Sequence, residues 1–123
     1  MRRLVAAVAV ALIGSLGLTA CGGDTSSSNQ DGAEQPVKKI AITFQGNDVT
    51  PSGTDIDVEV GQPVELDVTA DKPGEIHVHS SPEQEYEYDA RSSTIVVKPI
   101  EAPGWVTVES HTLEKTLFIL VAR

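Results

Sequence analysis

The fold class follows from two alternating runs and the segment between them: Ile56-Asp57-Val58-Glu59-Val60, then Gly61-Gln62-Pro63, then Val64-Glu65-Leu66-Asp67-Val68. In each run every second side chain is apolar, which is the period of a β-strand buried on one face. Glycine and proline in the connecting segment are typical of a turn. The segment therefore predicts two β-strands, each with one face in a core.

The same pattern extends to both sides of this segment. Alternation recurs at residues 40–44, and turn residues return at intervals of roughly ten, which is the spacing expected of a β-sandwich or barrel. Further strands are expected at residues 75–79, 85–89, 94–98, 105–110 and 117–122. Residues 117–121 are apolar on both parities, which favours a central strand covered on both faces. We expect one all-β domain at residues 37–123.

The N-terminus has the pattern of a secretory signal peptide. Arg2 and Arg3 precede an apolar run at residues 4–18, and Leu18-Thr19-Ala20-Cys21 reads as a lipobox. An uncleaved membrane helix is the alternative, but glycines interrupt a run at the short end of what spans a bilayer of about 30 Å. We expect residues 1–20 to be removed and Cys21 to be lipid-modified. The resemblance to bacterial lipoproteins implies two or three acyl chains, such as palmitate, that anchor Cys21 to the extracytoplasmic face of the cell membrane.

Residues 21–36 lack large apolar side chains and are rich in glycine, serine and acidic or amide residues. Such a composition cannot build a core and behaves as a flexible coil with a span of roughly 20 Å. We expect a disordered tether between the lipid and the domain.

The charge of the chain is acidic. Its net charge is −9, and loss of residues 1–20 makes it −11 because that segment contains two arginines and no acidic residue. Nucleic-acid binding requires clustered lysine and arginine, so this class of partner is excluded. The carboxylates are expected mainly to solvate the outer faces of strands.

Candidate chemistry is limited to three histidines. His77 and His79 share one face of an expected strand, about 6.6 Å apart along the chain, and can lean toward one ion. His111 completes the set if its strand pairs with or faces theirs, and Glu109 or a water is a candidate fourth ligand. If Ile76 and Val78 face the core, however, the two histidines merely decorate an exposed face.

Two segments resemble cupredoxin-like domains of bacterial extracytoplasmic lipoproteins. They are Asp71-Lys72-Pro73-Gly74-Glu75-Ile76-His77-Val78-His79 and Pro103-Gly104-Trp105-Val106-Thr107-Val108-Glu109-Ser110-His111. The resemblance covers residues 37–123 and implies a cupredoxin-like Greek-key β-sandwich of about seven or eight strands. It points to His77, His79, Glu109 and His111 as site residues. Ser80-Ser81-Pro82 departs from the Gly-Tyr-Asp that commonly follows the histidine pair.

The ligand supply excludes blue-copper electron transfer. Blue-copper sites need a thiolate, usually with a thioether, yet the resemblance places the family's cysteine at Ser110 and the chain beyond Cys21 has no cysteine or methionine, so another chain would have to contribute sulfur. Imidazole with carboxylate suits Cu(II) first and Zn(II) second. Because adjacent strand residues face opposite ways, Ser110 and His111 do not form a nucleophile–base pair, and we expect no enzyme. A metal-free module that docks an envelope protein is the alternative function.

Overall fold

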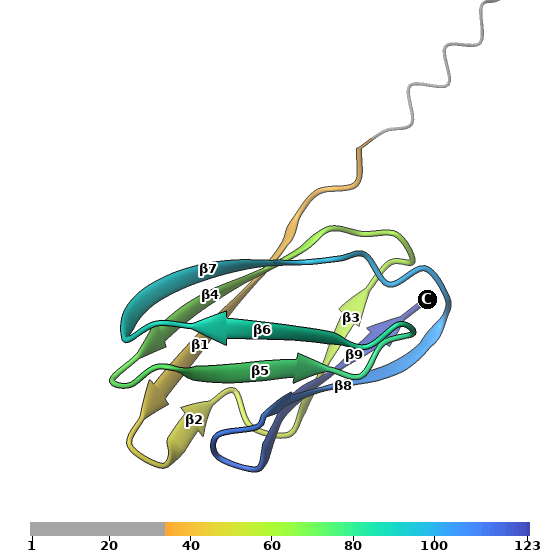
Figure 1. Cartoon of the computed structure of the whole chain (residues 1–123). Coiled ribbons are helices and arrows are strands. Elements are labelled where there is room, and N and C mark those ends of the chain that lie inside the picture. Colours follow the sequence, from red (N-terminus) through yellow and green to blue (C-terminus); the bar gives the residue numbers. More distant parts are fainter. Residues whose placement is uncertain (1–33) are drawn as a thin grey trace, which may run out of the picture. The chain divides into compact units, whose positions relative to one another are not determined.

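The computed structural model describes residues 34–123 as nine strands in two sheets, with no helix among those residues (Figure 1). The strands are β1 (Lys38–Gln45), β2 (Asp48–Thr50), β3 (Thr54–Val58), β4 (Val64–Ala70), β5 (Gly74–Val78), β6 (Gln84–Tyr88), β7 (Arg91–Val97), β8 (Gly104–Ser110) and β9 (Lys115–Ala122). The signal peptide, Cys21 and most of the expected tether lie outside the described residues.

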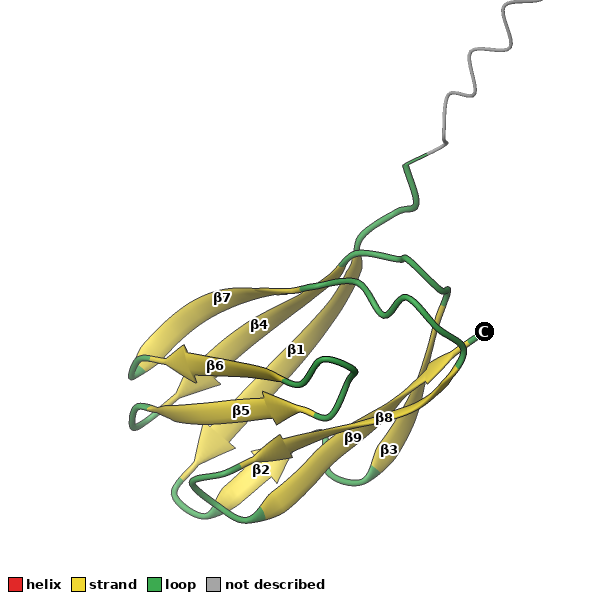
Figure 2. Ribbon diagram, turned by 45° about the vertical axis from the view of Figure 1, so that its right-hand side comes forward, coloured by secondary structure: helices red, strands yellow, loops and turns green. Residues whose placement is uncertain are grey.

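The strands form a four-stranded sheet of order β2-β1-β4-β7 and a five-stranded sheet of order β3-β9-β8-β5-β6 (Figure 2). Strand β1 runs parallel to β4, and β3 runs parallel to β9. All other pairs are antiparallel. The strands expected at residues 56–60 and 64–68 correspond to β3, which ends at Val58, and β4, and they lie in different sheets.

The core forms between the inward faces of the two sheets, as alternation predicts. In β4, Val64, Leu66, Val68 and Ala70 are buried, and the residues between them are more accessible. Burial of one face of each sheet removes apolar surface from water and stabilises the sandwich. The all-β prediction is confirmed. The structure has nine strands where about seven or eight were expected, because the short strand β2 forms between two turns and pairs with β1.

Strand β9 lies between β3 and β8, so the predicted interior position of the last strand is confirmed. Its register against β8 shifts between Val108 and Glu109, which is a β-bulge. Both Leu117 and Phe118 are fully buried members of the core cluster. The bulge lets two successive side chains, Leu117 and Phe118, enter the core. It therefore explains in part why apolar residues in this strand do not alternate with polar ones.

Backbone hydrogen bonds join the beginning and the end of the described chain to the turn between β3 and β4. The Lys38 amide donates to the Pro63 carbonyl at 2.8 Å. The Val60 amide donates to the Arg123 carbonyl, and the Arg123 amide donates to the Val58 carbonyl, both at 3.1 Å. Residues 58–63 thus hold both the first and the last strand of the domain.

A membrane-crossing helix would need a long apolar helical segment. None of the residues from 34 to 123 belongs to such a segment.

Candidate metal centre

His77 and His79 lie on the outer face of the five-stranded sheet. Their neighbours Ile76 and Val78 are fully buried in the core, so the alternation of β5 directs both histidines outward. This is the arrangement expected if the histidines only decorate the surface. His77 is nevertheless buried, with 7% of its surface exposed, because other side chains cover it on the outside of the sheet.

Pairing of β5 with β8 brings His111 to the same place. The two strands are antiparallel with Ile76 opposite Ser110, and the His111 amide donates to the Glu75 carbonyl at 3.2 Å. The ring centroids of His77 and His79 are 4.6 Å apart, and those of His77 and His111 are 4.8 Å apart. Two further imidazoles therefore lie close to His77 of β5: His79, which directly follows β5, and His111, which directly follows β8.

These ring separations fit a shared ion. At nitrogen–metal–nitrogen angles of about 90–110°, an ion about 2.0–2.1 Å from one nitrogen of each of two imidazoles holds their centroids roughly 4.5–5.2 Å apart. Both observed separations fall within that interval. The spacing of the rings is compatible with coordination of one metal by His77 together with either neighbour.

Four carboxylates surround the three rings. His79 Nε2 lies 3.1 Å from Glu109 Oε2, and His79 Nδ1 lies 3.3 Å from Glu83 Oε1. His111 Nδ1 lies 3.0 Å from Glu75 Oε1. The fourth carboxylate, from Glu85, belongs to β6, which pairs with β5 opposite His77. Together these seven side chains form what we call the His–Glu cluster: Glu75, His77, His79, Glu83, Glu85, Glu109 and His111.

The donor atoms of the His–Glu cluster do not converge on one point. Within residues 34–123, no set of three or more His, Cys, Asp or Glu side chains is placed to hold a metal ion. The reason is visible in the contacts, since the nitrogens of His79 and His111 are directed at carboxylates. Coordination of a common ion therefore requires rotation of side chains that are largely on the surface.

Both ring nitrogens of His77 are buried and have no hydrogen-bond partner. Nε2 lies 3.4 Å from a Glu85 oxygen and 3.6 Å from a Glu83 oxygen, but neither contact has hydrogen-bond geometry. Buried polar atoms are normally satisfied, and an unsatisfied one costs about 1–3 kcal/mol. Among the members of the cluster, His77 is the one with buried ring nitrogens that lack a hydrogen-bond partner.

The neighbouring carboxylates raise the pKa of His79. The hydrogen bond with Glu109 has the largest effect, burial opposes it, and the contact with Glu83 adds to it. Both ring nitrogens face carboxylate oxygens, and both can donate only in the imidazolium form. A metal ion at His79 must therefore displace a proton that the carboxylates help to retain.

Ser110 lies on the other side of the sheet. It is fully buried, and its Oγ accepts a hydrogen bond from the Leu113 amide at 3.2 Å. Its cross-strand partner Ile76 also faces the core. The side chain at the cysteine position of the resembling family is therefore separated from His77 and His79 by the sheet itself.

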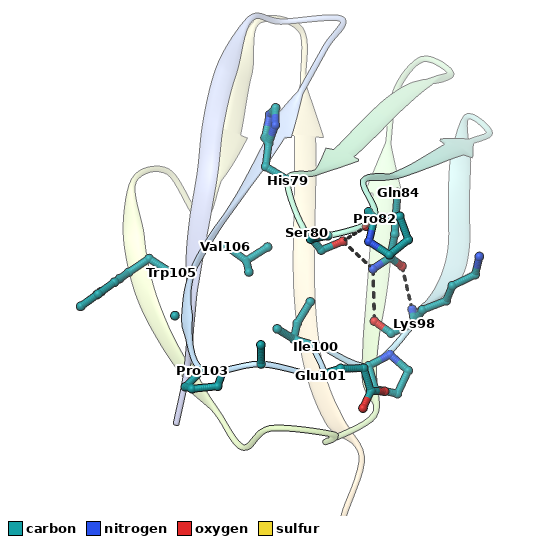
Figure 3. Close-up of a pocket in the computed structure, with 14 residues that line it drawn as sticks. His79, Ser80, Pro82, Gln84, Lys98, Ile100, Glu101, Pro103, Trp105 and Val106 are labelled. Atoms are coloured by element: carbon teal, nitrogen blue, oxygen red, sulfur yellow. Dashed lines mark hydrogen bonds between the residues drawn. The ribbon is translucent and has the colours of Figure 1, made fainter.

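A pocket of about 480 Å³ lies beside the His–Glu cluster. Of the three histidines only His79 lines it, and in Figure 3 the His79 side chain points away from the other lining residues. Gln84 is tied into the wall by hydrogen bonds to Ser80 Oγ at 2.8 Å and from the Lys98 amide at 2.9 Å. Trp105 also lines the pocket but extends outward, with 77% of its surface exposed (Figure 3).

The structure brings together all four site residues that the sequence indicates: His77, His79, Glu109 and His111. Sequence reasoning missed Glu75, Glu83 and Glu85. Glu75 could have been identified from the sequence, because Glu75, His77 and His79 are alternate residues of one strand and therefore share a face. The roles of Glu83 and Glu85 depend on the hairpin between β5 and β6, whose register places Glu85 opposite His77.

No protein-family model matches the chain, and no curated protein does. Among solved structures, the chain is similar to a novel purple cupredoxin from Nitrosopumilus maritimus, with 14% identity, a TM-score of 0.50, and coverage of 70% of this chain and 99% of that one. It is also similar to a multi-copper oxidase from Pediococcus acidilactici, with 14% identity and a TM-score of 0.50. That match covers 92% of this chain and 29% of the oxidase.

These similarities concern the fold. Together with the two-sheet architecture of residues 34–123, they confirm the prediction of a cupredoxin-like β-sandwich. At 14% identity they do not extend to ligands or activity. The chemistry available to this domain is therefore that of the His–Glu cluster.

Proposed function

We propose that this protein is a membrane-anchored extracytoplasmic lipoprotein whose cupredoxin-like domain binds or delivers Cu(II) through His77, His79 and His111. The observation that carries the proposal is the buried ring of His77, which has two unsatisfied nitrogens and two neighbouring imidazole rings. Neutral imidazoles supply nitrogen ligands, and the surrounding carboxylates supply negative charge for a dication. Lipid at Cys21 would hold the domain at the membrane surface.

The donor set favours a divalent ion of borderline softness. The cluster has imidazole and carboxylate groups and no sulfur, whereas Cu(I) prefers thiolate and thioether ligands. Cu(II) stands above Zn(II) in the affinity order of nitrogen and oxygen sites, so Zn(II) is the second choice. Ser110 faces the core, which supports a role in binding rather than blue-copper electron transfer.

The proposal is tested by metal analysis and titration of the full chain in detergent, purified without chelator or an affinity metal. We expect one Cu(II) per chain, and an affinity that falls as the pH is lowered, because protonated imidazoles cannot bind the metal. His77→Ala should lower the affinity at least a hundredfold.

Because His77 is buried, the exposed variants His79→Asn and His111→Asn test the site without disturbing a covered side chain. Each should lower the affinity at least tenfold, while Glu101→Gln, outside the cluster, should not change it. Unchanged Cu(II) titrations for all three histidine variants would refute the proposal.

A metal-free interaction module remains the second candidate, and the exposure of Trp105 favours it. Two hollows, of about 480 and 410 Å³, share Pro103, Gly104 and Trp105. Exposed tryptophan is enriched among residues that dominate protein interfaces. If the domain is an interaction module, a photo-crosslinking residue at position 105 should capture a single envelope protein in cells. The same residue at Val96, which is 65% exposed on the other sheet, should not. Equal labelling from both positions would count against it.

A further inference from the structure

Glu83 is the one carboxylate of the His–Glu cluster that touches two histidines. Its Oε1 lies 3.3 Å from His79 Nδ1, and its Oε2 lies 3.6 Å from His77 Nε2. Each oxygen of the carboxylate thus faces a different ring. No other hydrogen bond engages the Glu83 side chain within the described residues, and 62% of that side chain is exposed.

The scaffold around Glu83 fixes where its side chain starts. In the turn between β5 and β6, Ser80 Oγ donates to the Pro82 carbonyl at 2.6 Å, and Gln84 Nε2 donates to Ser80 Oγ at 2.8 Å. Gln84 is itself buried and accepts a hydrogen bond from the Lys98 amide. The residues on either side of Glu83 are therefore held, while its carboxylate remains free to move.

The other carboxylates are less suited to complete a site around His77. Glu109 touches His79 alone, and its second oxygen accepts a hydrogen bond from Thr116 Oγ1 at 3.3 Å. Glu75 touches only His111. Glu85 contacts His77 but neither of the other two histidines. Only Glu83 can reach His77 and His79 at once.

An acidic cluster alone would not indicate a ligand, but here the carboxylate faces an unsatisfied buried ring. His77 is more than nine-tenths buried, and neither nitrogen has a hydrogen-bond partner. The contact from Glu83 is too long and poorly aligned to satisfy Nε2. The three donors do not converge as placed, but rotation of the exposed His79 and Glu83 side chains would let a cation bridge them to His77 and satisfy the imidazole and the carboxylate together.

From this geometry we infer that Glu83 is a metal ligand that completes the site with His77 and His79 and makes it selective for divalent over monovalent copper. The inference rests on the proposed function. A carboxylate is a hard oxygen donor with a negative charge, so it stabilises Cu(II) or Zn(II) more than Cu(I), which prefers sulfur. Loss of this one charge should therefore reduce affinity for the dication more than affinity for Cu(I).

The experiment compares the full chain with the variants Glu83→Gln and Glu87→Gln. Glu87 is an exposed residue of the neighbouring strand β6 and has no contact with a histidine, so its variant removes the same charge without removing a ligand. We expect Glu83→Gln to lower Cu(II) affinity at least tenfold and Cu(I) affinity less than threefold. We expect Glu87→Gln to change both less than threefold.

Electron paramagnetic resonance of the Cu(II) form provides a second readout. Replacement of a carboxylate ligand should change the copper hyperfine coupling in Glu83→Gln but not in Glu87→Gln. Unchanged spectra and affinities in Glu83→Gln, with binding still lost in His77→Ala, would overturn the role of Glu83 and leave the proposed function standing. Absence of Cu(II) binding by the unmodified chain would overturn both.

Discussion

The rings of His77 and His111 meet edge to face, with centroids 4.8 Å apart and planes inclined at 69°. His77 belongs to β5 and His111 follows β8, and the antiparallel pairing of these strands creates the contact. His79 and His111 thus both lie against the His77 ring. Burial of His77 on the outside of a sheet is therefore a result of the cluster and not of the core.

The pKa of His79 is predicted to lie above its usual value of about 6.5, chiefly because of the hydrogen bond with Glu109. A raised folded-state pKa stabilises the fold below about pH 6.5, and this stabilisation disappears as the pH rises through the folded-state value. Its size should stay under about 1 kcal/mol because the ring is partly exposed. NMR titration of the metal-free protein should show the pKa fall in Glu109→Gln. No fall relative to Glu87→Gln would contradict the role of Glu109.

Leu117→Ala is predicted to cost about 2–5 kcal/mol in the free energy of unfolding, because the bulge places Leu117 fully inside the core. Ile119→Ala, in the same strand at a half-buried position, should cost less. Urea denaturation of the two variants checks the difference. If Ile119→Ala proved the more destabilising variant, the assignment of the bulge would be wrong.

Gly74→Ala is predicted to destabilise the fold by roughly 1–3 kcal/mol through overpacking. Gly74 lies opposite Tyr88, and an added Cβ would approach Tyr88 Cζ to 2.6 Å and Thr112 Oγ1 to 2.9 Å. The Tyr88 ring cannot easily withdraw because it stacks on Phe44 at 4.8 Å. Thermal unfolding should show a smaller penalty for Gly74→Ala in a Tyr88→Leu background. Equal penalties in both backgrounds would refute the steric explanation.

Ser110→Cys is predicted not to create a blue-copper site. The new thiol would face the core beside Ile76, while His77 and His79 lie on the outer face. Visible absorption after addition of Cu(II) measures this, since a copper–thiolate bond gives an intense charge-transfer band. Appearance of that band would show that the sheet does not separate position 110 from the histidines.

Cys21→Ala is predicted to release the protein from the membrane into the medium. The expected acyl chains contribute about 0.8 kcal/mol per buried methylene group, and stable anchoring needs more than one such chain. Fractionation of cells that express the variant, with Ser27→Ala as the control, measures the released share. Retention of the Cys21→Ala protein in the membrane fraction would exclude lipid anchoring at this residue.

Alternation was sufficient to predict which side chains of a strand enter the core. Val64, Leu66 and Val68 are buried as their alternation indicates, whereas for Ile76 and Val78 the sequence left the facing open and the structure places both in the core. Alternation carries no information on which strands pair, so the parallel contacts of β1 with β4 and of β3 with β9 were not predicted. The bulge in β9 was also missed, because one extra residue in a strand does not change the amino-acid composition from which strands are recognised.

The candidate site was predicted in part for the same reason. His77 and His79 share a parity that can be read from sequence, whereas the approach of His111 depended on the pairing of two strands. Glu83 and Glu85 reach the histidines through a hairpin register. The sequence shows which residues share a face within one strand, but it does not show which residues of different strands come into contact. Metal binding itself stays a prediction.

The turn at residues 58–63 holds the first and last strands of the domain by backbone hydrogen bonds. Fluorescent dyes attached at Gln35 and Arg123 would therefore sit at the same corner, where the Gln35 amide also donates to Glu59 at 3.1 Å. Energy transfer between such dyes would be high in the intact domain and would drop when this corner frays. Energy transfer between these dyes would therefore report folding of this corner without a label on any histidine.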